Sequence, residues 1–303
     1  MALDIYQAVT DRILSILDQG VAPWRQPIRG TGSDGLLPTN LESLRAYRGI
    51  NVFLLAMTSW AEGFGSPYWM TYRQAAAKGG HVRKGQKGSL VIFWKQYATR
   101  DKKTDEPINV PVLRHYTVFN AEQCEGIELP SPTAPVDSET EQSQFEPNEA
   151  CAAIVAGYAG GPVIEHRGSR ACYRPRTDTV QIAEPERFET RESYYATLFH
   201  ELAHSTGHSK RLDRGLDKDL KPFGSPDYSR EELVAEFASA FLAAAAGIGV
   251  QTVEQSASYI DGWRKKLRSD KKIVVTAAGA GQRAADLILG TEHDNSSQAS
   301  EPE

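Results

Sequence analysis

The 303-residue sequence predicts an α+β fold divided between two domains. A chain of this length suits two domains of ordinary size. Residues 129–148 are rich in Pro, Ser, Thr and acidic residues and lack periodic apolar positions, which is typical of a linker. Helical and alternating apolar patterns occur on both sides of it. We therefore predict a first domain at residues 1–126, a linker at 127–148, a second domain at 149–290 and a disordered tail at 291–303.

Three helices are predicted at the start of the first half. The first covers residues 5–19, where apolar residues recur at helical spacing. The second covers residues 50–61 and is strongly apolar. The third runs over residues 71–78, because Thr71 and Gln74 match the capping box that begins many helices.

Strands and further helices follow. Residues 89–97 and 110–119 predict a β-hairpin, joined by a polar turn and flanked by basic residues. The second half predicts, in order, a helix at 147–158, strands at 163–166, 171–174 and 179–182, and helices at 191–206, 229–246, 253–267 and 276–289. Short strands followed mostly by helices again indicate an α+β domain.

The composition limits the class of protein and its location. No apolar run reaches the ~18–20 residues that span a bilayer, so we expect no membrane association. The N-terminal residues do not combine a basic stretch with an apolar one, which argues against a secretory signal. The three cysteines, Cys124, Cys151 and Cys172, form no CxxC pair, which argues against a disulfide framework and a thiolate zinc site. These features predict a cytoplasmic protein.

The net charge of −5 is unevenly distributed. Residues 1–126 hold 15 basic and 11 acidic residues, a net charge of +4, whereas residues 151–303 hold 19 basic and 22 acidic residues, a net charge of −3. Within residues 71–103, nine basic residues accompany a single acidic residue, Asp101. This segment indicates a polyanionic partner for the first half, and the alternative is a solvated basic surface.

A metal-binding motif occurs at residues 200–204, which read His-Glu-Leu-Ala-His. His200 and His204 are one turn apart on the same helix face, so both imidazoles can reach one ion at ~2.0–2.1 Å. Glu201 would then act as the general base for peptide hydrolysis. The expected ion is Zn²⁺, with Mn²⁺ as the alternative. The ordinary alternative for such a pair is two histidines with no ligand role.

A catalytic zinc site usually has a third protein ligand. His208 would lie ~12 Å along a straight helix from His200 and could not share its ion. The metzincin pattern also fails, because Lys210 stands where that pattern has its third histidine. We keep His208, together with Tyr228, as a candidate for stabilising the oxyanion.

The third ligand is expected on the next helix, where Glu232 and Glu236 are one turn apart. This arrangement resembles that of the gluzincins, in which a Glu ligates zinc and a carboxylate one turn later holds a ligating His by its other nitrogen. We therefore predict Glu232 as the ligand and Glu236 as the supporting carboxylate, with Glu231 and Glu236 as rival ligands. Ser229 and Glu232 also match a capping box, so Glu232 could instead only fix the start of the helix.

Longer stretches of sequence resemble one known family. HELAHSTGHSKRLDR at 200–214 and EELVAEFASAFL at 231–242 are similar to the zincin-like domain of the ArdC antirestriction family. PTNLESLRAYRGINVFLL at 38–55, YWMTYRQAAAKGGHVRKGQKGSLVIFW at 68–94 and YTVFNAEQ at 116–123 resemble its N-terminal domain, which also occurs in plasmid primases of the TraC type. The resemblance implies single-stranded DNA binding without sequence preference by the first half and a metalloprotease-like second half. It also implies a role on conjugative plasmids, protecting incoming DNA from type I restriction.

The first half contains the two side-chain types that hold a single strand, which are cations for phosphates and aromatic rings on which bases stack. The candidate DNA contacts are Arg25, Tyr47, Arg48, Tyr72, Arg73, Arg83, Lys84, Lys87, Trp94, Lys95, Lys102, Lys103 and Arg114. Among these, Trp94, Tyr47 and Tyr72 are the candidates for base stacking, and core packing is the alternative role for each ring.

The sequence therefore predicts a DNA-binding antirestriction protein with a peptidase site. The protein substrate would be a component of the restriction system or a protein bound to DNA. One rival is a catalytically silent zincin scaffold that protects DNA by binding it. The other is a DNA-dependent protease of the SprT-like class.

Overall fold

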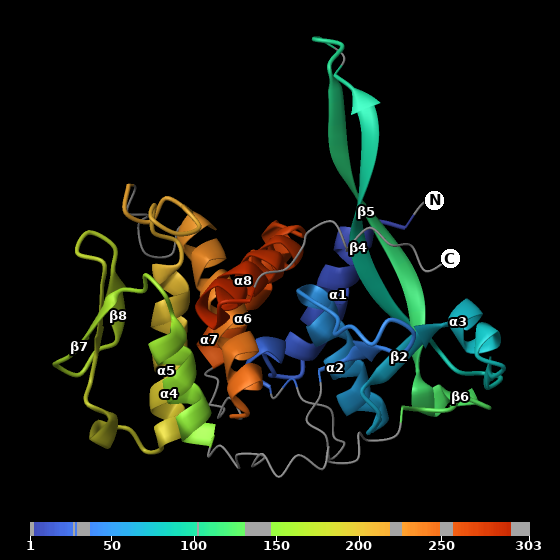
Figure 1. The fold of residues 1–303 in the computed structure, drawn as a ribbon, viewed down its shortest axis with the longest axis horizontal. Helices are drawn as coiled ribbons and strands as arrows, with labels where there is room; N and C mark the ends of the chain where they lie inside the picture. The colour runs from blue at the N-terminus through green and yellow to red at the C-terminus, as the bar shows by residue number, and fades with distance from the viewer. Residues whose placement is uncertain are drawn as a thin grey trace.

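The computed structural model describes residues 3–26, 28, 37–101, 103–130, 147–218, 226–248 and 257–291. Figure 1 shows a central group of helices, with a small sheet at one end and a second α+β region at the other. A long two-stranded hairpin projects from that second region, away from the helices (Figure 1). This arrangement confirms the predicted α+β class.

The first half combines three α-helices with two sheets in the described residues. Its elements are α1 (Ile5–Leu17), the 3₁₀ turn η1 (Pro23–Arg25), β1 (Thr39–Asn40), α2 (Ile50–Glu62), β2 (Tyr68–Thr71), α3 (Tyr72–Ala77), β3 (His81–Val82), β4 (Ser89–Arg100), β5 (Pro107–Asn120), η2 (Ala121–Gln123) and β6 (Cys124–Glu125). The larger sheet has the order β1-β2-β5-β4, and β3 pairs with β6 in a separate ribbon. Only the β1–β2 pair of the larger sheet is parallel.

The three predicted helices of this half are confirmed. The Thr71–Gln74 capping box is present, since the backbone N–H of Gln74 donates to Thr71 Oγ1 at 3.2 Å and that of Thr71 donates to Gln74 Oε1 at 2.8 Å. The hairpin is longer than predicted, because the β4–β5 ladder continues to the pair Arg100–Pro107. The sequence did not indicate this extension, because Pro107 and the polar residues around the turn disfavour strands and a projecting ribbon has no core that would require apolar alternation.

The second half places a small sheet before four long helices in the described residues. Its elements are α4 (Pro147–Gly157), β7 (Val163–His166), β8 (Cys172–Arg174), β9 (Thr179–Ile182), η3 (Pro185–Arg187), α5 (Arg191–Ser205), α6 (Pro226–Ala246), α7 (Ala257–Ser269) and α8 (Ile273–Leu289). The sheet has the order β7-β9-β8, in which β8 is an edge strand antiparallel to β9. Within the described ranges no helix is both long and apolar enough to cross a membrane.

One hydrophobic core joins the two halves. Phe237 of α6 contacts Trp24 and Phe53 of the first half, with ring centroids 5.4 Å and 4.8 Å away. Phe53 also packs against Phe241 at 5.3 Å, and Trp24 against Trp263 at 5.5 Å. All of these rings are buried. The two predicted domains therefore pack against each other through a shared core.

Polar contacts also join the two halves of the chain. Arg48 forms an ion pair with Asp286 of α8, and the backbone N–H of Gly49 donates to Gln282 Oε1 at 3.1 Å. Thr10 Oγ1 donates to the backbone oxygen of Lys271 at 2.8 Å. Most of the predicted linker, residues 131–146, and most of the predicted tail, residues 292–303, lie outside the described residues.

The shared core predicts cooperative unfolding. Replacing Phe237 with Ala leaves a cavity at the boundary, which should cost about 3–5 kcal/mol and destabilise both halves together. Urea unfolding followed by tryptophan fluorescence and by far-UV circular dichroism should give coincident transitions at a lower midpoint. Leu129→Ala is the control, because Leu129 is 44 % exposed and should change the stability little. Two separated transitions in the parent protein would contradict a single core.

Candidate metal centre and candidate nucleic-acid contacts

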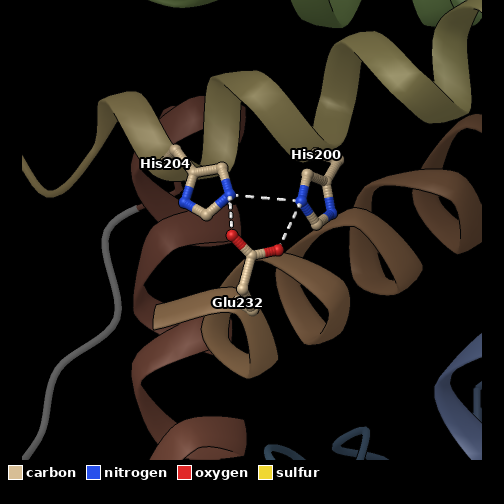
Figure 2. A group of neighbouring side chains, drawn as sticks. All are labelled: His200, His204 and Glu232. Carbon is tan, nitrogen blue, oxygen red and sulfur yellow. Dashed lines mark hydrogen bonds and ion pairs between the residues drawn. The ribbon is translucent and has the colours of Figure 1, made fainter. Parts of the chain in front are cut away.

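Three predicted ligands converge between helices α5 and α6 (Figure 2). His200 Nε2 and His204 Nε2 are 3.1 Å apart. The two oxygens of Glu232 lie 3.5 Å from His200 Nε2 and 3.6 Å from His204 Nε2. Two atoms that ligate one tetrahedral zinc at 2.0–2.1 Å are separated by ~3.4 Å, so this donor set fits a divalent metal ion. Two imidazoles and one carboxylate are also a usual ligand set for a catalytic metal.

Helix α5 presents the two histidines because its opposite face is buried. Thr190 caps the helix by accepting a hydrogen bond from the backbone N–H of Ser193 at 3.1 Å. Leu198, Phe199 and Leu202 are buried in the core. His200 and His204, four residues apart, consequently lie on one face toward α6.

Helix α6 supplies Glu232 as an interior residue. The helix begins at Pro226, three residues before Ser229, so Ser229 is not its N-cap. The capping-box interpretation of Ser229 and Glu232 is therefore wrong. Figure 2 shows the Glu232 carboxylate directed at both imidazoles, in the position expected of a ligand.

The carboxylate that contacts a candidate ligand histidine is Glu231, whereas the predicted Glu236 pairs with Arg25. Glu231 Oε1 lies 3.3 Å from His204 Nδ1, the ring nitrogen that faces away from Glu232. Arg214 holds the same carboxylate with two hydrogen bonds, of 2.6 Å and 2.8 Å. Burial raises the pKa of Glu231, but the hydrogen bonds from Arg214 and His204 outweigh it and lower the pKa overall. An ionised Glu231 orients His204 and favours its metal-binding nitrogen.

Arg214 reaches this position through the loop after α5. Its Nη2 donates to the backbone oxygen of Ala203 at 3.0 Å, and its Nη1 donates to Thr206 Oγ1 at 2.8 Å. A Cβ on Gly207 would come within 2.6 Å of Leu216 and 3.0 Å of Arg214 Nη2. Helix α5 ends at Ser205, and the glycine at position 207 leaves room for Leu216 and the arginine.

Glu236 connects the metal-binding helix to the first half of the chain. Its carboxylate accepts hydrogen bonds from Arg25 Nη2 and Tyr259 OH, both at 2.7 Å. The Arg25 guanidinium also lies 4.3 Å from the centre of the Tyr259 ring, and Trp24 Nε1 donates to Tyr259 OH at 3.1 Å. Sequence spacing placed Glu236 on the face of Glu232 but gave no indication of these distant partners.

Glu201 is buried beside the edge strand of the small sheet. Its Oε2 accepts a hydrogen bond from the backbone N–H of Tyr173 in β8 at 2.7 Å. Tyr173 is held by its hydroxyl, which donates to Asp178 Oδ1 at 2.9 Å. Arg211, from the loop after α5, pairs with Asp178 and donates to the Tyr173 hydroxyl at 3.2 Å. The predicted general base is thus fixed between the histidine helix and an edge strand.

Of the two candidates for oxyanion stabilisation, the structure describes the side chain of His208 but not that of Tyr228. His208 is buried and lies outside the three-residue cluster. Its Nδ1 accepts a hydrogen bond from the backbone N–H of Lys210 at 3.1 Å, and its Nε2 is 3.9 Å from Asp217. Tyr228 belongs to the first turn of α6, but its side chain lies outside the described residues.

Two of the predicted DNA contacts, Arg25 and Arg48, are used within the protein, in the ion pairs with Glu236 and Asp286. Tyr47 is half-buried and packs against the core. Trp94 is also half-buried, with its ring centroid 6.5 Å from that of Tyr6.

Most of the other predicted contacts are exposed; Arg83 and Lys95 are half-buried, and Lys102 lies outside the described residues. Tyr72, at 60 %, and Arg73 are exposed at the start of α3. Arg83, Lys84 and Lys87 lie in the loop before β4, where the two lysines are exposed. Lys95, Lys103 and Arg114 belong to the β4–β5 hairpin. Tyr97, which the sequence analysis missed, lies beside Lys95 and Arg114.

The carboxylates around the metal site predict that metal binding releases a proton. Burial lowers the pKa of His200, but the hydrogen bond to Glu232 and the charges of Glu236, Glu201 and Glu232 outweigh it and raise the pKa to about 9. In the metal-free protein His200 is therefore protonated at neutral pH, and a metal ion must displace that proton. Metal affinity should rise by up to about tenfold per pH unit between pH 6 and 8. Calorimetry in buffers of different ionisation enthalpy should detect about one released proton, whereas a pH-independent affinity would contradict this prediction.

Comparison with known families divides the chain in the same place as the predicted linker. The N-terminal domain of anti-restriction factor ArdC matches residues 3–119, and the zincin-like metallopeptidase family matches residues 151–280. The protein y4eC of Sinorhizobium fredii is 37 % identical over 300 residues, which cover 96 % of this chain and 93 % of y4eC. The DNA primase TraC of Escherichia coli is 36 % identical over 95 % of this chain, but the chain spans only 27 % of that primase.

Solved structures show the same likeness in three dimensions. The Mn(II)-bound structure of the antirestriction ArdC protein from the R388 plasmid aligns with a TM-score of 0.72 and 34 % identity, over 99 % of this chain and all of that one. The metal-free structure of that protein aligns with a TM-score of 0.74 and 36 % identity, over 96 % of this chain and all of that one. Since the likeness covers both halves and the full length of that protein, this chain belongs to the ArdC antirestriction family.

Proposed function

We propose that this protein binds single-stranded DNA, protects incoming conjugative DNA from type I restriction, and hydrolyses peptide bonds at the α5–α6 metal centre. The single observation that supports the peptidase most strongly is the His200–His204–Glu232 cluster with Glu201 on the same helix. Membership of the ArdC family supports the antirestriction role. The match to its N-terminal domain and the likeness to a TraC primase support DNA binding.

Each residue of the centre has a separate role in the proposed hydrolysis. His200, His204 and Glu232 would hold the ion, which we propose to be Zn²⁺, with Mn²⁺ supported by the Mn(II)-bound ArdC structure. A bound divalent ion supplies a Lewis acid that polarises the scissile carbonyl. Glu201 accepts the proton of the attacking water, and the N–H of Tyr173 keeps its carboxylate in place. Tyr228 remains the proposed oxyanion donor, with His208 as the second choice because its ring already contacts Lys210 and Asp217.

The peptidase proposal predicts that Glu201→Gln abolishes protection in vivo. A positioned general base contributes about 10²- to 10⁴-fold to the rate, and glutamine keeps the shape of glutamate without accepting a proton. Protection from a type I restriction system should therefore fall to the level of cells without the protein. Metal content and DNA affinity should stay within about twofold of the parent, since Glu201 is not among the metal-ligand cluster.

Glu189→Gln is the matched control, because Glu189 is exposed just before α5 and the change removes the same charge. Full protection by Glu201→Gln would contradict the peptidase proposal and favour a DNA-binding shield on a zincin scaffold. Cleavage that requires added single-stranded DNA would favour the DNA-dependent protease, so purified protein should be incubated with candidate substrates with and without such DNA.

The DNA-binding proposal predicts strong salt dependence. Each phosphate neutralised by a cation contributes about −0.7 to the slope of log affinity against log salt for a single strand. Contact with three or more phosphates gives a slope of about −2 or steeper. Raising NaCl fourfold, from 50 to 200 mM, should then weaken binding at least about tenfold. Arg73→Gln should reduce the slope, whereas Arg191→Gln, in the second half, should not. A salt-independent affinity in fluorescence anisotropy would contradict phosphate binding by the first half.

A further inference from the structure

The β4–β5 hairpin has one face on which aromatic rings and cations alternate. Successive residues of a strand point to opposite faces, so Phe93, Lys95 and Tyr97 share one face of β4. The register pairs Phe93 with Arg114 and Lys95 with Val112, which places Arg114 on that face of β5. Tyr116, two residues after Arg114, lies on it as well. We define the five residues Phe93, Lys95, Tyr97, Arg114 and Tyr116 as the ring face of the hairpin.

The rings of this face are arranged for stacking. Phe93 and Tyr116 are parallel within 3°, with centroids 4.6 Å apart. Tyr97 lies between two cations, since Lys95 Nζ is 5.5 Å and Arg114 Cζ is 5.4 Å from its ring centre. Arg114 also donates a hydrogen bond to Tyr97 OH at 2.8 Å, which fixes the ring against the guanidinium. The ring face thus presents half-buried aromatic rings next to positively charged side chains.

The opposite face of the hairpin is covered further along the strands than the ring face, where Tyr116 at the base packs against the buried cluster of Trp69 and Val91. On the opposite face, Trp94 lies beside Tyr6 of α1, and Leu113 packs against the main core. Arg114 is exposed and forms no ion pair with the described residues, whereas Arg100 near the tip pairs with Asp105 at 2.9 Å. The positive charge of the middle of the hairpin is therefore directed outward, while that of the tip is partly neutralised.

We propose that the ring face is the platform on which the bases of single-stranded DNA stack, with Tyr97 as the central ring. The proposal rests on the DNA binding proposed above and assigns it a location. Rings beside cations are the side chains that hold a single strand without sequence preference. Phe93 and Tyr97, four residues apart, are separated by ~13 Å along the strand. A DNA strand that crosses both positions brings its intervening phosphates close to Lys95 and Arg114.

The platform explains why a two-stranded ribbon extends beyond the core. An isolated two-stranded ribbon gains little stability from burial. The outer part of this hairpin also exposes apolar residues such as Ile108 and Val110. Figure 1 shows the hairpin well apart from α5, the helix that carries His200 and His204, so a single strand on the ring face would lie away from that helix.

The test compares two substitutions of Tyr97 with one of Arg114. The probe is a fluorescein-labelled 20-nucleotide oligo-dT, and anisotropy is measured over a series of NaCl concentrations. Tyr97→Leu should weaken binding about tenfold, as expected for the loss of one base–ring stack, with little change in salt slope. Tyr97→Phe should bind like the parent, because it keeps the ring. Arg114→Gln should lower the salt slope by about 0.7, the share of one phosphate contact.

Gln96→Ala is the matched control, since Gln96 is exposed on the opposite face of the same strand. All variants should unfold at the same temperature as the parent, because the substituted side chains lie outside the core. Photocrosslinking with 5-iododeoxyuridine should label Tyr97, Phe93 or Tyr116.

The outcomes separate this inference from the proposed function. Parental affinity and salt slope in both Tyr97→Leu and Arg114→Gln, with the parent still binding DNA, would overturn the platform and leave DNA binding in place. Crosslinks confined to the loop before β4 would do the same. Absence of salt-dependent binding by the parent would overturn the proposed DNA binding itself.

Discussion

Glu231 and Glu236 of helix α6 are largely buried, at 13 % and 10 % side-chain exposure, and Glu232 beside them is 27 % exposed; each of these carboxylates faces a cationic or histidine side chain. Buried carboxylates are costly unless paired, and removing one partner leaves the other uncompensated. Glu232 faces the two histidines of α5, Glu231 is held by Arg214, and Glu236 is held by Arg25. Each partner comes from a different segment of the chain. Helix α6 therefore fixes the geometry of the metal centre, the loop after α5 and the boundary with the first half.

The apolar residues of the same helix must be buried away from water. Phe237 and Phe241 pack against Phe53 of the first half, so one helix contributes both to the metal centre and to the shared core. Arg25 belongs to a turn whose neighbour Trp24 is buried in that core. Its contact with Glu236 is a consequence of this packing, because burying Trp24 brings the adjacent guanidinium to α6. The first half is in this way linked to the helix that carries the candidate metal ligand Glu232.

The local parts of this arrangement could be predicted from the sequence. Helical periodicity predicted the helices, and residue spacing predicted that His200, His204 and Glu232 come together as candidate metal ligands, because these features depend on a few neighbouring residues. The supporting carboxylate was assigned wrongly, since Glu231 and Glu236 are distinguished only by Arg214 and Arg25, and Arg25 is 211 residues from its partner. The shared core was missed for the same reason: an apolar helix face does not indicate which distant face covers it.

The relatives indicate that the two halves form one physical unit. The TraC primase of Escherichia coli is more than three times as long as this chain, yet its likeness covers 95 % of the chain, including both halves. The shared core gives a reason for this, because separating the halves would expose Phe53, Trp24 and Phe237 to water. Under the function proposed above, single-stranded DNA bound by the first half would be held at a fixed position relative to the His200–His204–Glu232 cluster.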